Sequence, residues 1–114
     1  MLLPHELTLT VIDEDIDSHV TFSFDCPVAR AAVRALKAAG VDTSEIYCSA
    51  AGGHPLIVCA RDSTLCGKYG ANAVLTRWIR RYDLWTYVVG PLRPGPLTVT
   101  LKAQAAQAAL ETGE

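Results

Sequence analysis

Two segments near opposite ends of the chain alternate strictly between apolar and polar side chains. They are residues 7–11 (LTLTV) and 97–101 (LTVTL). Successive side chains of a strand point to opposite faces of a sheet, so this pattern is typical of a strand with one buried face and one solvated face. The fold must therefore contain a sheet that is apolar on one side and polar on the other.

Other segments also have the composition of strands. Residues 20–24 alternate in the same way after an acidic stretch at 13–18, which predicts a hairpin of 7–11 with 20–24 whose tip is acidic. A short strand is expected at 45–48, and residues 84–89 are rich in β-branched and aromatic side chains. The continuous apolar run at 56–60 predicts a central strand covered on both faces.

Two helices are predicted between these strands. The first begins at Pro27, which suits a first helical turn, and ends before Gly40, which suits the left-handed position after a helix. The second is expected over about 70–82, where apolar residues recur at helical spacing. Residues 102–114 form an Ala-rich tail, either helical or frayed.

The order ββαββαββ, with a further helix if the tail forms one, has no strict βα alternation. We therefore expect one α+β domain over residues 1–101. It should contain a mostly antiparallel sheet of five or six strands, with two helices, or three with the tail, on one face. The length of 114 residues and an apolar content of 50% agree with a single domain that has a hydrophobic core.

The location and redox state follow from what the sequence lacks. No apolar run approaches the ~20 residues that span a bilayer, so no membrane association is expected. The first residues show neither a basic region nor a cleavage site of a secretory signal, which predicts a cytoplasmic protein. The cysteines would then be mostly thiols; they are Cys26, Cys48, Cys59 and Cys66.

Charge is unevenly distributed along the chain. No Lys or Arg precedes Arg30, whereas the segment at 13–17 carries four carboxylates: Asp13, Glu14, Asp15 and Asp17. Residues 61–81 are basic instead. Such a polar molecule is suited to a charged partner or to head-to-tail pairing.

Two clusters resemble metal sites without matching one. Cysteine and histidine ligands suit zinc, but the C-x₂₋₄-C pairs of structural zinc sites are absent from the set Cys48, His54, Cys59 and Cys66. The acidic segment resembles the start of a calcium-binding loop, but Ser18 and Phe24 stand where such a loop needs Gly and Glu. We predict no metal and no cofactor, and expect the acidic segment to act as a charged surface towards a basic partner.

The second predicted helix carries a basic edge. Arg77, Arg80 and Arg81 share a face at spacings of three and four, and Trp78 adjoins them. Arginine beside aromatic rings occurs in nucleic-acid, nucleotide and protein interfaces alike. The isoelectric point of about 5.9 argues against a dedicated duplex binder, which is normally basic.

These features favour a small non-catalytic interaction protein, such as an inhibitor, an adaptor or an accessory protein of phage or mobile-element type. A protein partner is expected; nucleic acid or a nucleotide stays an open alternative, as does a homodimer formed through a strand edge. The predicted binding residues are Asp13, Glu14, Asp15, Asp17, His54, Arg77, Trp78, Arg80 and Arg81.

A second hypothesis is a small-molecule or nucleotide site, or a small enzyme. It would use the loop of Gly52, Gly53 and His54 together with Cys66 and nearby arginines. A Gly-rich turn can hold an anion with its N–H groups, and histidine beside cysteine can activate a thiol. The loop lacks the P-loop lysine and any GxGxxG pattern, so no reaction type follows.

Overall fold

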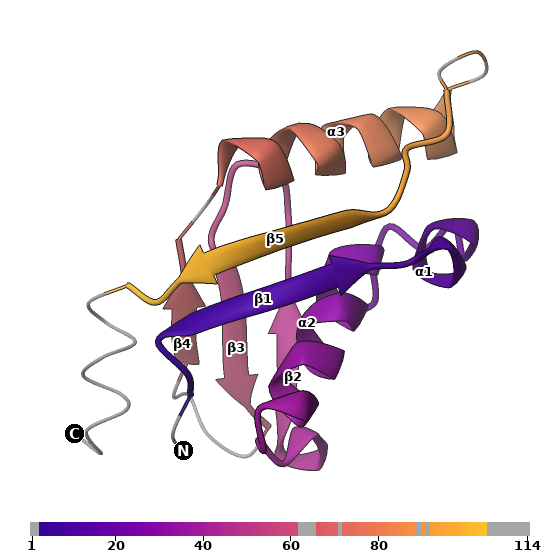
Figure 1. Cartoon of the computed structure of the whole chain (residues 1–114). Coiled ribbons are helices and arrows are strands. Elements are labelled where there is room, and N and C mark those ends of the chain that lie inside the picture. The colour runs from indigo at the N-terminus through magenta and orange to yellow at the C-terminus, as the bar shows by residue number, and fades with distance from the viewer. Residues whose placement is uncertain (1–2, 62–65, 71, 89, 91, 105–114) are drawn as a thin grey trace.

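The computed structural model describes residues 3–61, 66–70, 72–88, 90 and 92–104 (Figure 1). Within them the antiparallel strands form a two-stranded sheet, β1-β5, and a three-stranded sheet, β2-β3-β4. This confirms the α+β class, although the strands form two sheets rather than one. The elements are β1 (Glu6–Val11), α1 (Asp13–Asp17), α2 (Pro27–Ala38), the 3₁₀ helix η1 (Thr43–Glu45), β2 (Ile46–Ser49), β3 (Leu56–Ala60), β4 (Cys66–Tyr69), α3 (Ala73–Tyr87) and β5 (Leu97–Lys102).

The strictly alternating segments pair with each other. Leu7 lies opposite Leu101, and Val11 lies opposite Leu97. The apolar side chains of both strands point into the core, while the threonines share the solvated face, where the Thr8 and Thr100 hydroxyls lie 2.7 Å apart. In Figure 1, β5 lies between β1 and helix α3. Both ends of the described chain therefore build one ladder.

The three-stranded sheet buries one face. Its core side chains are Ile46, Cys48, Leu56, Val58 and Tyr69. β3 is the central strand, as predicted, but its other face is covered only in part, since Cys59 is buried there while Ile57 is half-buried. A bridge between Tyr69 and Ala103 joins the two sheets.

Helix α2 forms as its sequence predicts. Pro27 occupies the first turn and Gly40, with φ of 91°, follows the last one. Its buried stripe packs against β1 and β2 and includes Val28, Ala29, Ala32 and Leu36. The helix thus covers the side of the molecule on which the acidic segment lies (Figure 1).

The predicted N-terminal hairpin is wrong. Residues 13–17 form α1, and 20–24 contain no strand; Phe22 and Phe24 are 78% and 64% exposed. Acidic side chains favour the first turn of a helix, and the Asp15 carboxylate accepts a hydrogen bond from the Ile12 N–H there. Alternation suggested a strand at 20–24, but β1 pairs instead with β5 near the other end of the chain.

The second helix is longer and begins later than predicted. Asn72 caps α3, which runs on to Tyr87 and so covers most of the segment predicted as a strand at 84–89; residue 89 lies outside the described residues. The aromatic side chains Trp78, Tyr82 and Trp85 follow helical spacing, so they favour continuation of the helix. β4 was missed because CGKY has neither alternation nor strong strand propensity. The tail assignment is tested only at its start, where Lys102 belongs to β5; 105–114 lie outside the described residues.

Two of the four cysteines are not thiols. Cys59 and Cys66 lie opposite each other in the β3–β4 ladder, with Cα atoms 4.1 Å apart, and form a disulfide. The expectation of thiols holds for Cys26 and Cys48, both buried. A disulfide is more usual in an oxidising compartment, so the cytoplasmic location stays a prediction. No helix among the described residues is long and apolar enough to span a bilayer.

Candidate binding groove on helix α3

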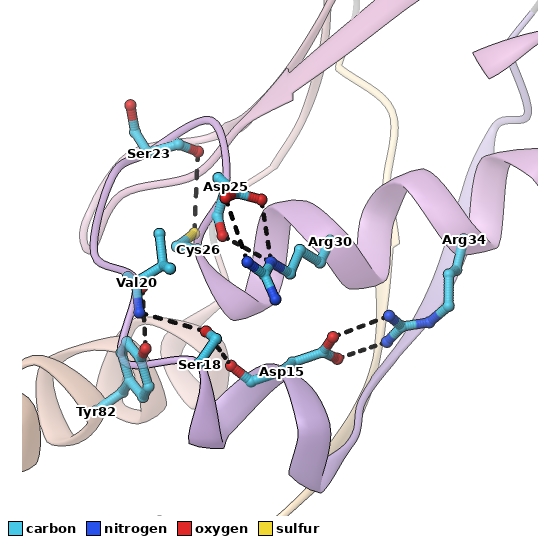
Figure 2. Close-up of polar contacts among 9 residues, drawn as sticks. All are labelled: Asp15, Ser18, Val20, Ser23, Asp25, Cys26, Arg30, Arg34 and Tyr82. Atoms are coloured by element: carbon cyan, nitrogen blue, oxygen red, sulfur yellow. Dashed lines mark hydrogen bonds and ion pairs between the residues drawn. The ribbon is translucent and has the colours of Figure 1, made fainter. Parts of the chain in front are cut away.

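The acidic segment is built into the fold rather than free at a hairpin tip. The Asp15 side chain is only 4% exposed, and its oxygens accept hydrogen bonds from the Arg34 guanidinium at 2.9 and 2.5 Å (Figure 2). Burial alone would raise the pKa of Asp15, but the bonds from Arg34 and the Ile12 N–H, with the arginine charge, outweigh it and hold the pKa below its usual value. This carboxylate therefore stabilises the contact of α1 with α2.

The other carboxylates of α1 remain at the surface. Arg93 makes ion pairs of 3.0 Å with both Asp13 and Asp17, while Glu14 is exposed and has no ion pair within the described residues. The structure thus gathers the four predicted acidic residues on one short helix, and Arg34 and Arg93 offset part of their charge.

The arginines of α3 are in a different situation. Helix α3 buries Leu75, Ile79 and Tyr82, and Asn72 caps its start by accepting from two backbone N–H groups. Three arginines lie on the exposed side, and within the described part of the chain none of them makes an ion pair: Arg77, Arg80 and Arg81.

A groove of about 220 Å³ opens between α3 and β5. Arg77 and Arg81 are among its lining residues, and the rest are apolar or aromatic: Val74, Trp78 and Leu97. The Trp78 indole N–H donates to the Gly95 C=O at 2.8 Å, which fixes the chain that leads into β5 beside the helix. Arg80 is not part of the groove, because its stem lies beside Gly52. Three of the four residues predicted on this helix thus come together.

An exposed stripe continues from the groove along α3. Residues three or four positions apart share a helix face, and the side chains of this stripe are Val74, Arg77, Arg81, Leu84 and Val88. Leu84 is 53% exposed. Apolar side chains therefore flank the two arginines, a composition typical of a contact surface with a charged centre.

The alternative site is not assembled in this structure. His54 lies exposed in the loop after β2, next to Gly53 with φ of 81°. The Cys66 sulfur is bonded to Cys59, so it offers no thiol to a histidine. Gly52, with Ala50 and Ala51 of the same loop, lines a cavity of about 100 Å³ that also has Asp83 and Cys26 among its walls.

This cavity lies at the start of α2, where Figure 2 shows Cys26 and Ser23. Burial raises the pKa of the Cys26 thiol, and the nearby Asp83 charge raises it further against the opposing effect of the helix N–H groups. Burial also raises the pKa of Asp83 and, to about 12, that of Cys48. Burial thus favours the neutral thiol over the thiolate at both free cysteines.

Asp83 has no hydrogen bond or ion pair within the described residues, which leads to a stability prediction. Its folded pKa is raised, so its contribution is favourable below the unfolded value of 3.8 and is lost as the pH rises through the folded value. Asp83→Asn should therefore raise the free energy of unfolding at pH 7 by up to about 1 kcal/mol. Urea titration at pH 7 and at low pH would measure this.

The gain should vanish on acidification, where Asp83 is neutral in both states. Glu14→Gln is the matched control, since it removes an exposed carboxylate and should change stability little. A loss of stability in Asp83→Asn at neutral pH would show that the ionised carboxylate has a favourable partner.

No three His, Cys, Asp or Glu side chains in the described ranges gather in a way that could hold a metal ion. No protein-family model, curated protein or solved structure matches this chain. The inference about function therefore depends on the geometry alone. Sequence reasoning missed Val74 and Leu97 as groove residues; Val74 falls at helical spacing from Arg77 and Arg81, but nothing in the sequence places Leu97 beside them.

Proposed function

We propose that this protein is a small non-catalytic interaction protein that binds an acidic segment of a partner protein in the groove between α3 and β5. Arg77 and Arg81 would meet carboxylates, while Val74, Trp78 and Leu97 would contact an apolar side chain between them. The groove thus presents positive charge and apolar surface side by side, which suits an acidic segment that also carries an apolar side chain.

One observation carries the proposal: two arginines without an ion-pair partner in the described chain border an apolar groove. Arg30, Arg34 and Arg93 each pair with aspartate, whereas Arg61 and Arg80 also lack an ion pair in the described residues but lie outside this groove. Arginine and tryptophan are over-represented among the residues that dominate protein interfaces, and unpaired charges steer an oppositely charged partner.

The exposed carboxylates of α1 would form a second, weaker contact. Asp13, Glu14 and Asp17 keep their surface exposure even where Arg93 pairs with them. A partner with a basic region would meet them with modest energy, because exposed charges are screened by water and salt. We therefore assign the main binding role to α3.

Co-purification from the native host, followed by mass spectrometry, tests the proposal. Arg77→Glu and Arg81→Glu should each weaken capture of a stoichiometric protein by roughly tenfold, since each places a like charge against the acidic segment. Arg80→Glu is the matched control: it makes the same charge change on the same helix, outside the groove.

Equal losses in all three variants would show that only net charge matters and would contradict a groove. Recovery of nucleic acid in place of protein, with the same dependence on Arg77 and Arg81, would favour the open alternative. Self-capture as a stable homodimer would identify a second copy as the partner.

A further inference from the structure

Strand β5 has one edge that no strand of the described chain covers. It pairs with β1 on one side only, and helix α3 lies along the other side (Figure 1). The Ala103 N–H donates to the His5 C=O at 2.7 Å, and this bond shows which residues of β5 direct their backbone groups towards β1. Because paired positions alternate in an antiparallel ladder, Val99 and Leu101 bond to β1, whereas Thr98, Thr100 and Lys102 point their backbone groups away from it.

Two contacts confirm which backbone groups point outward. The Lys102 C=O accepts a hydrogen bond from the Gly70 N–H at 2.8 Å on the outer side. On the opposite strand, the outward Thr10 C=O accepts from Arg34. Thr98 and Thr100 have no such partners within the described residues, so two N–H and two C=O groups face outward in a row.

The free edge is bordered by open space at both ends. The groove of about 220 Å³ lies at the Leu97 end, and a second cavity of about 270 Å³ lies at the Lys102 end, lined also by Gly70, Asn72 and Thr100. Both lie on the side of β5 that faces α3 and the chain leading into it. A free strand edge beside a helix is the arrangement in which peptide-binding domains receive an added strand.

We infer that the acidic partner segment binds in extended form, as an additional strand on the Thr98–Thr100 edge of β5. This inference rests on the proposed function. The backbone of the segment would satisfy the four outward groups of β5. Its side chains on one face would enter the groove, where Arg77 and Arg81 select carboxylates. The structure assigns both an affinity element, the backbone pairing, and a specificity element, the arginines.

Charge favours a partner segment over a second copy of this chain. Pairing of β5 with β5 would bring the Arg77, Arg81 and Lys102 charges of two copies together, and like charges in contact are unfavourable. An acidic strand neutralises the same charges. Dimerisation through this edge is thus an outcome that the test below can detect, by sedimentation of the peptide-free protein.

The test is a titration of isotope-labelled protein with a short soluble peptide of alternating glutamate and valine, followed by amide NMR shifts. The Thr98 and Thr100 amides should shift most, and saturation should be reached at millimolar peptide. The same peptide N-methylated throughout keeps its side chains but cannot pair with a strand, and it should bind at least roughly tenfold more weakly. A lysine-for-glutamate peptide should not bind.

Two protein variants separate the inference from the proposed function. Thr98→Pro removes one outward N–H at an edge position that tolerates proline, and should weaken binding roughly fivefold; Thr98→Val keeps that N–H and should bind normally. If Arg77→Glu abolishes binding while N-methylation and Thr98→Pro have no effect, strand addition is wrong and the arginine groove stands. If no amide shifts at millimolar peptide, strand addition is wrong, and the co-purification experiment alone then tests whether the groove binds a partner.

Discussion

Replacement of Arg34 by methionine is expected to lower the free energy of unfolding by about 3 kcal/mol at neutral pH, because it leaves a buried carboxylate without its counter-ion. Asp15 would retain only the Ile12 N–H as a donor. The Thr10 C=O would also lose the hydrogen bond that the Arg34 guanidinium donates to it. Urea denaturation followed by circular dichroism measures the change. Arg30→Met is the matched control: its partner Asp25 is exposed, so the loss should stay below about 1 kcal/mol.

The same pair predicts how stability depends on pH. The pKa of Asp15 is lowered in the folded state, so its stabilising contribution is present above the unfolded value of 3.8 and is lost as the pH falls through the folded value. Acidification below about pH 4 should therefore destabilise the wild type more steeply than Arg34→Met. Equal acid sensitivity of the two proteins would contradict a role for this pair.

Removal of the Cys59–Cys66 disulfide should cost about 2.5 kcal/mol, the value expected for a loop this short from the chain entropy of the unfolded state. The two cysteines are seven residues apart and tie edge strand β4 to β3. The double variant Cys59→Ala with Cys66→Ala should lower the urea midpoint, and wild-type protein treated with a dithiol reductant should match it. An unchanged midpoint in both samples would mean that the disulfide does not constrain the unfolded chain.

The parts of the fold that the sequence predicts are those in which local pattern and burial agree. Helix α2 combines a proline start, a glycine end and a continuous apolar stripe, and it forms where predicted. The alternation at 7–11 and 97–101 predicts strands correctly but carries no information about pairing. The hairpin was wrong for that reason, since a sequence neighbour at 20–24 was assumed as the partner.

In the candidate site, too, local patterns predict some features and contacts between distant segments determine the others. Helical spacing alone is enough to place Arg77, Trp78 and Arg81 on adjoining faces of α3. The engagement of Asp15 by Arg34 and the free edge at Thr98 depend on contacts between distant segments, so no local pattern could indicate them. The spacing of the cysteines along the chain likewise could not indicate that Cys59 and Cys66 lie opposite each other in a ladder.

The pairing of the first strand with the last one has a consequence for biosynthesis. A nascent chain that has not yet emerged as far as Lys102 offers β1 nothing to pair with, so its backbone groups stay hydrated and α2 lacks a finished surface to pack on. Folding of the domain must then wait until translation has passed β5. A circular permutant that links the two ends, placing β5 directly before β1, would make this ladder a local hairpin and should fold faster than the natural order.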